Sequence, residues 1–133
     1  MDVVVDTSIV LAVLTSEPER ARIIDLTKDA DLIAPASVHW EIGNALSAML
    51  KRKRLTLEQA TEVIHAYAKI PIRFLEVSLL DALRIAGANN LYAYDAYVVS
   101  CAQSQHCSLI SLDRSLIQAA RDTGVPVIEV TDQ

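Results

Sequence analysis

Four carboxylates stand out in this sequence because each is expected where a strand ends or a helix begins. They are Asp6, Glu41, Asp95 and Asp113. Singly, each fits an ordinary structural role, since Asp is favoured at helix N-caps and acids in a first turn suit the helix dipole. Gathered in one site, four like charges keep some of the group protonated unless a cation neutralises them. All-oxygen sites suit Mg²⁺ or Mn²⁺ and support metal-assisted phosphoryl chemistry with an activated water.

The elements that must position these acids predict an α/β fold with a five-stranded parallel sheet flanked by helices. Strands are expected over residues 3–5, 31–34, 72–77, 109–112 and 127–130, and helices over 9–14, 16–28, 37–54, 56–69, 78–88, 94–105 and 115–122, before a short tail. Strands that alternate with helices form parallel sheets with right-handed crossovers. Because the carboxyl ends of parallel strands share one edge, Asp6, Glu41 and Asp113 are expected to converge there. Asp95 joins these three acids if the helix that it begins starts at the same edge of the sheet.

Local signals set the expected helix ends and the expected core. The spacings Ser16–Glu19 and Thr56–Gln59 are those of capping boxes, and Ser37 is placed to cap the helix that follows it. Thr7 is expected to start the first helix, which would leave Asp6 free to face a ligand. Trp40 lies on an apolar pattern of helical spacing and is expected in the core. The two helices over 37–69 form an added helical hairpin, which is a lobe or a partner surface.

Length and composition point to one domain with an aliphatic core. The chain has 133 residues, of which 52% are hydrophobic but only 5% aromatic. No apolar run approaches the roughly 20 residues of a membrane span, and the acidic N-terminus does not resemble a signal peptide, so a cytoplasmic protein with no membrane contact is expected. Cys101 and Cys107 are expected as buried thiols rather than as a disulfide. The net charge of −5 argues against a protein that coats nucleic acid non-specifically, but not against a nuclease whose acids hold cations.

Four short motifs together resemble the PIN-domain family, and within it the VapC-type ribonuclease toxins of prokaryotic toxin–antitoxin pairs. They are Val4–Ser8, Trp40–Leu46, Tyr94–Tyr97 and Leu109–Asp113, which occur in the family's order over essentially the whole chain. The resemblance implies a single PIN domain over residues 1–133 and an endoribonuclease that depends on Mg²⁺ or Mn²⁺. It implies that Asp6, Glu41, Asp95 and Asp113 are both the catalytic and the metal-binding residues. It also implies an RNA substrate, a VapB-type antitoxin and a homodimer.

Several other residues are candidates for contacts with substrate or metal. Thr7 and Ser8 are expected near the metal or its waters, and Ser111 supplies a hydroxyl where the family often has Thr. Asn44 lies three residues after Glu41, on the same helix face. It is a candidate to hydrogen-bond Glu41 or a phosphate oxygen, and the alternative is a local contact within the helix. Arg114 is a candidate phosphate contact. The tract Lys51–Arg54 is either a solvated helix end or a contact for RNA or antitoxin, and Tyr92, Tyr94 and Tyr97 fit core or dimer packing better than base stacking.

Two other functions remain open from the sequence. One is a catalytically inactive PIN-like binding module that acts through partners. The other is a phosphatase that uses Asp6 as a nucleophile. Such phosphatases need a second Asp two residues later, and that position is Ser8 here.

Overall fold

Five short strands form a single parallel sheet in the computed structural model, which describes residues 1–130. The strand order is β3-β2-β1-β4-β5. The strands are β1 (Asp2–Val5), β2 (Asp31–Pro35), β3 (Ile72–Leu75), β4 (Ser108–Ile110) and β5 (Val127–Ile128). Val4 of the central strand pairs with Ile33 on one side and Leu109 on the other. The predicted α/β class and five-stranded parallel sheet are confirmed.

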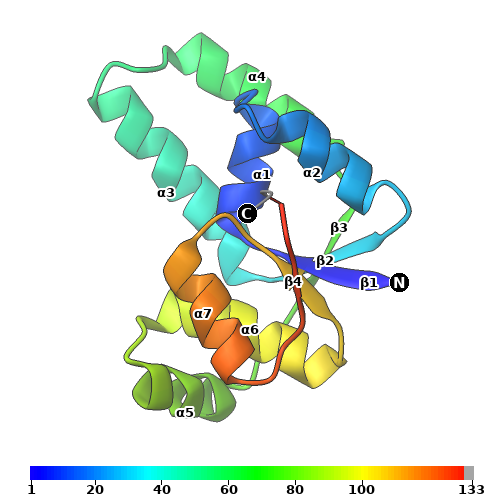
Figure 1. The fold of residues 1–133 in the computed structure, drawn as a ribbon. Helices are drawn as coiled ribbons and strands as arrows, with labels where there is room; N and C mark the ends of the chain where they lie inside the picture. The colour runs from blue at the N-terminus through cyan, green and yellow to red at the C-terminus, as the bar shows by residue number, and fades with distance from the viewer. Residues whose placement is uncertain (131–133) are drawn as a thin grey trace.

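Seven helices cover the two faces of the sheet (Figure 1). They are α1 (Thr7–Leu14), α2 (Arg20–Thr27), α3 (Ser37–Lys51), α4 (Leu57–Ala68), α5 (Leu79–Asn89), α6 (Ala93–Gln105) and α7 (Arg114–Asp122). Helices α1 to α4 lie on one face, and α5 to α7 lie on the other. The hairpin of α3 and α4 projects away from the sheet. Within residues 1–130, no helix has the length and apolarity needed to span a membrane.

The centre of the sheet is apolar because both of its faces are covered. Val3, Val4 and Val5 are at most 1% exposed, and the facing residues Ile33 and Leu109 are fully buried. A strand covered on both faces reads as a continuous apolar run, which is what residues 3–5 show. Burial of this run fixes the end of β1, and therefore fixes the backbone position of Asp6.

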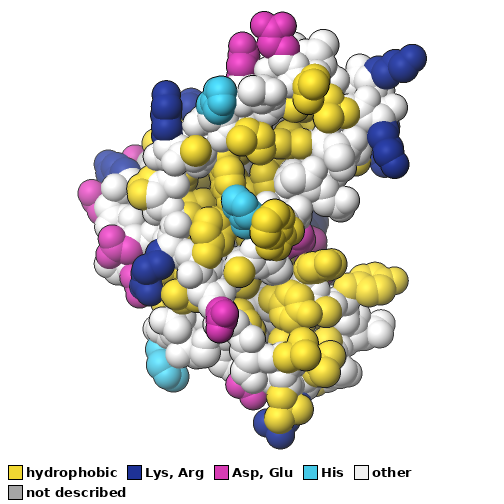
Figure 2. Space-filling view, turned by 180° about the vertical axis from the view of Figure 1, so that it is seen from behind, with side chains coloured by type: hydrophobic (Ala, Val, Ile, Leu, Met, Phe, Trp, Pro, Cys, Tyr) yellow, Lys and Arg dark blue, Asp and Glu magenta, His cyan; other side chains and the backbone are white. Residues whose placement is uncertain are grey.

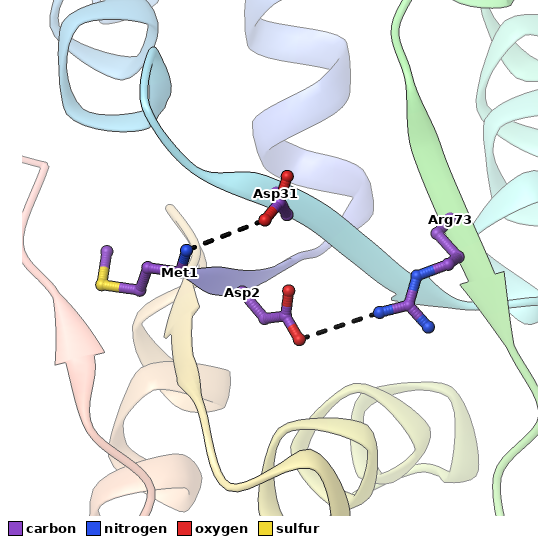
Figure 3. Close-up of polar contacts among 4 residues, drawn as sticks. All are labelled: Met1, Asp2, Asp31 and Arg73. Atoms are coloured by element: carbon purple, nitrogen blue, oxygen red, sulfur yellow. Dashed lines mark ion pairs between the residues drawn. The ribbon is translucent and has the colours of Figure 1, made fainter.

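The amino edge of the sheet carries charges that are paired with one another (Figure 3). The terminal ammonium of Met1 lies 3.7 Å from Asp31, and Arg73 lies 3.7 Å from Asp2. Exposed pairs of this kind contribute at most about 1 kcal/mol each. They matter here for their location. At the opposite, carboxyl edge, Asp6 and Asp113 form no ion pair with any cation among residues 1–130.

Several local expectations are wrong. Helix α2 begins only at Arg20 and has no side-chain cap, because Ser16 adopts a left-handed backbone (φ 56°) that ends the preceding turn. Ala36 is the N-cap residue of α3, and the Ser37 hydroxyl has no hydrogen-bond partner. Trp40 is 73% exposed, because α3 buries the series Val38, Ile42 and Leu46, and Trp40 lies about 200° around the helix from Val38.

Other local expectations are confirmed. The capping box of Thr56 and Gln59 is present at α4, and the Ser78 side chain caps α5. Gly124 follows α7 with φ 85°, the left-handed backbone that favours glycine after a helix. Both cysteines are free thiols, but only Cys101 is buried as expected, whereas Cys107 is partly exposed. The expected tail after residue 130 lies outside the described residues.

Candidate active site

Asp6 lies at the carboxyl end of β1 and is almost completely buried, at 5% exposed. Its Oδ1 accepts hydrogen bonds from Ser8 Oγ at 2.7 Å and from the Ile9 backbone N–H at 3.2 Å. Its Oδ2 accepts one from Ser111 Oγ at 2.6 Å. Asp6 is therefore the N-cap of α1, contrary to the expectation that Thr7 takes this role. The carboxylate caps the helix and still lies at the sheet edge.

Two serine hydroxyls connect the ends of β1 and β4 through Asp6. Besides donating to Asp6, Ser8 Oγ accepts from the Leu112 backbone N–H at 3.0 Å. Ser111 Oγ accepts from the Asp113 backbone N–H, also at 3.0 Å. Each hydroxyl thus joins the Asp6 carboxylate to the backbone of the segment that carries Asp113. This network fixes the orientation of Asp6 and the path of the chain after β4.

Asp113 is the N-cap of α7, and its Oδ1 accepts hydrogen bonds from the Ser115 and Leu116 backbone N–H groups. One of its carboxylate oxygens therefore serves the helix. Asp95 is the third residue of α6 and is half-buried. Burial raises the pKa of Asp95, and the nearby charge of Asp113 raises it further.

Glu41 comes from one turn inside α3 and completes the group. Burial raises the pKa of Glu41, as do the charges of Asp95 and Asp6, while the Thr7 hydroxyl beside it lowers that pKa. The Thr7 hydroxyl is buried and forms no hydrogen bond with any residue among 1–130. Burial also raises the pKa of Asp6, and the charge of Asp113 adds to this against the hydrogen bonds from Ser111, Ser8 and Ile9. Each of the four acids thus lies within electrostatic range of two others, because Asp6 and Asp95 are both near Asp113 and near Glu41. We call the four acids the carboxylate cluster.

The charge of the carboxylate cluster favours a bound cation, but the positions of its side chains do not yet form a metal site. Among residues 1–130, no Lys, Arg or His forms an ion pair with any of the four acids. Raised pKa values and absent counter-charges are what an all-oxygen cation site shows without its ion. The side chains do not form a ready cage, since no three Asp, Glu, His or Cys among the described residues are placed to hold a metal ion together. Cation binding would therefore draw the carboxylates inward.

The remaining candidates lie around the carboxylate cluster rather than within it. Asn44 is exposed one turn beyond Glu41 on α3. Arg114 lines a cavity of about 490 Å³ that also touches Ser111. The same cavity is lined by Arg121, which pairs with Glu129 and which the sequence reasoning missed. Both arginines lie on α7, seven residues apart and therefore on one face, but the predicted helix began only at residue 115 and so did not include Arg114.

The three tyrosines near Asp95 differ in burial, which tests the expected core packing, whereas the alternative of dimer packing stays a prediction. Tyr92 is 87% exposed and Tyr94 is 57% exposed, whereas Tyr97 is partly buried against the core. Tyr94 and Tyr97 make an edge-to-face contact with ring centres 5.9 Å apart. Core packing therefore holds for Tyr97 alone.

Residues 3–122 match the family model of the PIN domain. The chain belongs to the PIN-domain family. No curated protein matches it in sequence. The predicted family membership is confirmed, and the match covers all four acids of the carboxylate cluster.

Solved structures share this PIN fold. PAE2754 from Pyrobaculum aerophilum has a TM-score of 0.73 at 23% identity, over 96% of this chain and 92% of that one. FitAcB from Neisseria gonorrhoeae has a TM-score of 0.71 at 14% identity, over 96% and 97%. VapBC2 from Rickettsia felis, bound to a DNA fragment from its promoter, has a TM-score of 0.68 at 14% identity, over 96% and 98%.

Proposed function

We propose that this PIN protein is a metal-dependent endoribonuclease and the toxin of a VapBC-type toxin–antitoxin pair. The observation that carries the proposal is the carboxylate cluster, whose four acids come from separate segments and form no ion pair with any cation among residues 1–130. Family membership supports nuclease chemistry. The toxin role is supported by a further neighbour of the same fold, a toxin–antitoxin complex from Klebsiella pneumoniae, with a TM-score of 0.68 at 15% identity over 98% of this chain and 99% of that one.

In this proposal Asp6, Glu41, Asp95 and Asp113 hold Mg²⁺ or Mn²⁺. When bound, such an ion supplies Lewis acidity, which lowers the pKa of a water nucleophile and stabilises a leaving oxygen. The protein supplies orientation, because Ser8 and Ser111 hold Asp6 in one rotamer at a buried strand end. Exposed groups at the rim, among them Asn44 and Arg114, are placed to contact phosphate oxygens of the RNA.

The test is RNA cleavage by the wild-type protein and by the Asp6→Asn variant, each with Mg²⁺, with Mn²⁺ and with EDTA. Asp25→Asn is the matched control, since Asp25 is an exposed acid on α2. We expect wild type and control to cleave only with metal and to leave 5′-phosphate and 3′-hydroxyl ends, and Asp6→Asn to be inactive. Equal cleavage by Asp6→Asn would refute the site. Absence of both cleavage and metal binding in the wild type would favour an inactive binding module.

We also propose that the protein assembles with partner chains, as a homodimer and with a VapB-type antitoxin. Helix α5 exposes Leu79, Leu80 and Leu83, which are 53–60% exposed, and Trp40 and Tyr94 are exposed as well. Soluble monomers rarely expose large contiguous apolar patches, and Figure 2 shows hydrophobic side chains spread over this side of the molecule. Light scattering of the purified protein tests the dimer. Co-purification with the product of a small reading frame upstream tests the antitoxin.

A further inference from the structure

The positive charge of this acidic chain is concentrated at the tip of the α3–α4 hairpin. Residues 42–57 contain four cations, Lys51, Arg52, Lys53 and Arg54, and no Asp or Glu. The other 117 residues hold only eight of the 12 Lys and Arg but all 17 Asp and Glu. All four tip cations are exposed, and none is in an ion pair with another described residue. Figure 2 shows Lys and Arg side chains standing out at this end of the hairpin.

Helix α3 connects this tip to the carboxylate cluster along one face. Glu41, Asn44, Ala48 and Arg52 follow one another at spacings of three and four residues, so they share a face of the helix. With a rise of 1.5 Å per residue, the 11 steps from Glu41 to Arg52 span about 16 Å. Asn44 is exposed on this path, and Ala48 is small. The face therefore offers no negative charge between the cluster and the tip.

The tip is an ordered turn, so its cations are held at a fixed place. The Arg52 backbone N–H bonds to the Ala48 carbonyl, and that of Arg54 bonds to the Met49 carbonyl. Lys53 takes a left-handed backbone with φ 57°. Favourable interaction with the helix dipole is confined to the last turn of a helix, whereas Lys53 and Arg54 lie beyond the end of α3. The helix end alone does not account for four cations.

We propose that the Lys51–Arg54 tip binds the phosphate backbone of the RNA, about 16 Å from the bond that the carboxylate cluster cleaves. The inference rests on the proposed ribonuclease function and adds a second anchoring point for the same substrate. At about 3.4 Å per stacked nucleotide, the RNA would extend about five nucleotides from the cleaved bond to reach the tip. The tip is a backbone contact, so it adds affinity without selecting bases.

Binding of a labelled random-sequence 20-nucleotide RNA, measured by fluorescence anisotropy in EDTA, tests this surface apart from cleavage. The tip variant replaces all four tip cations by Gln, and the control replaces four exposed cations elsewhere by Gln, namely Arg22, Lys28, Lys69 and Arg84. Each lost phosphate contact lowers the slope of log K against log salt by about 0.7, so four contacts lower it by about 2.8. Between 50 and 200 mM salt, the wild type should therefore lose about 50-fold more affinity than the tip variant. The double variant R52Q/R54Q should show about half the change in slope.

Cleavage separates this inference from the proposed function. We compare the fold-loss in kcat/KM, relative to the wild type, on two RNAs. For the tip variant this loss should be at least ten times larger on a cleaved 20-nucleotide RNA than on a hexamer centred on the same bond, because the hexamer does not reach the tip. If the wild type cleaves RNA but the tip variant matches the control in both assays, the inference is overturned and the tract is assigned to a protein partner. If the wild type cleaves nothing but the slope still falls in the tip variant, the ribonuclease proposal fails and the RNA-binding tip stands.

Discussion

Replacing Asp6 by Asn should stabilise the metal-free protein and abolish its stabilisation by metal. Asp6 is 5% exposed, and burial together with the Asp113 charge raises its pKa, so the ionised carboxylate destabilises the metal-free fold. Asn keeps the shape and caps helices as well as Asp does. Single stabilising substitutions commonly give about 0.5–2 kcal/mol, and we expect this range for removal of the buried charge. The entropy of unfolding is about 0.28 kcal/mol/K for 133 residues, so Tm should rise by about 2–7 °C in EDTA.

Metal should reverse this order of stability. At a metal concentration 100 times the Kd, binding to the folded state adds about 2.7 kcal/mol, which is about 10 °C in the Tm of the wild type. Asp6→Asn should gain little, because its cluster has lost a charged ligand. Differential scanning fluorimetry in EDTA, Mg²⁺ and Mn²⁺ measures both effects, with Asp25→Asn as the control. A Tm of Asp6→Asn below that of the wild type in EDTA would refute the reasoning.

The pH dependence of the same measurement has a definite sign. Because the folded-state pKa of Asp6 is raised, the unfolded chain loses this proton first as pH increases above the ordinary value of 3.8. Its contribution to wild-type stability therefore falls as pH rises from that value through the raised folded-state pKa. The advantage of Asp6→Asn in EDTA should be absent at lower pH and reach its full size above the folded-state pKa. An advantage independent of pH would show that packing, not charge, is its cause.

Three further predictions concern the surroundings of the site and the scaffold. Ser111→Ala removes a donor to Asp6 and an acceptor for the Asp113 N–H, so chemical denaturation should show a loss of about 1–3 kcal/mol, with Ser111→Thr closer to wild type. Thr56→Ala removes the capping box of α4 and should cost about 1 kcal/mol by the same measurement, whereas Thr61→Ala on the exposed side of α4 should cost less. Burial raises the pKa of Cys101 to about 12, so its thiol should resist alkylation at pH 8 until the protein unfolds. Rapid labelling of Cys101 in the native protein would contradict its buried position.

The fold was predictable because its signals are periodic and repeated. Val3–Val5 and Leu109–Ile110 are short apolar runs typical of doubly covered strands, and strands and helices alternate throughout. The order β3-β2-β1-β4-β5 then brings Asp6 and Asp113 to neighbouring strand ends. Their proximity followed from topology, without any knowledge of side-chain positions.

The details that failed depend on the phase of a helix or on a single backbone angle. Trp40 and Val38 are both apolar and two residues apart, so composition alone does not tell which one faces the core. Ser16 matched a capping spacing, but its left-handed φ delays the start of α2 to Arg20. The serine network around Asp6 was also beyond prediction, because it joins residues more than 100 positions apart by side-chain geometry.

The capping role of Asp6 does not account for its charge. Asn and Ser cap a helix about as well as Asp, without placing a buried anion near two other acids, Asp113 and Glu41. Two serine hydroxyls and one backbone N–H bond to Asp6, yet burial still dominates and its pKa stays raised. At the amino edge of the same sheet, Asp2 and Asp31 are each paired with a cation of the chain. Among residues 1–130, Asp6 has no such cation, and this contrast between the two edges supports the proposal that a bound divalent cation supplies its counter-charge.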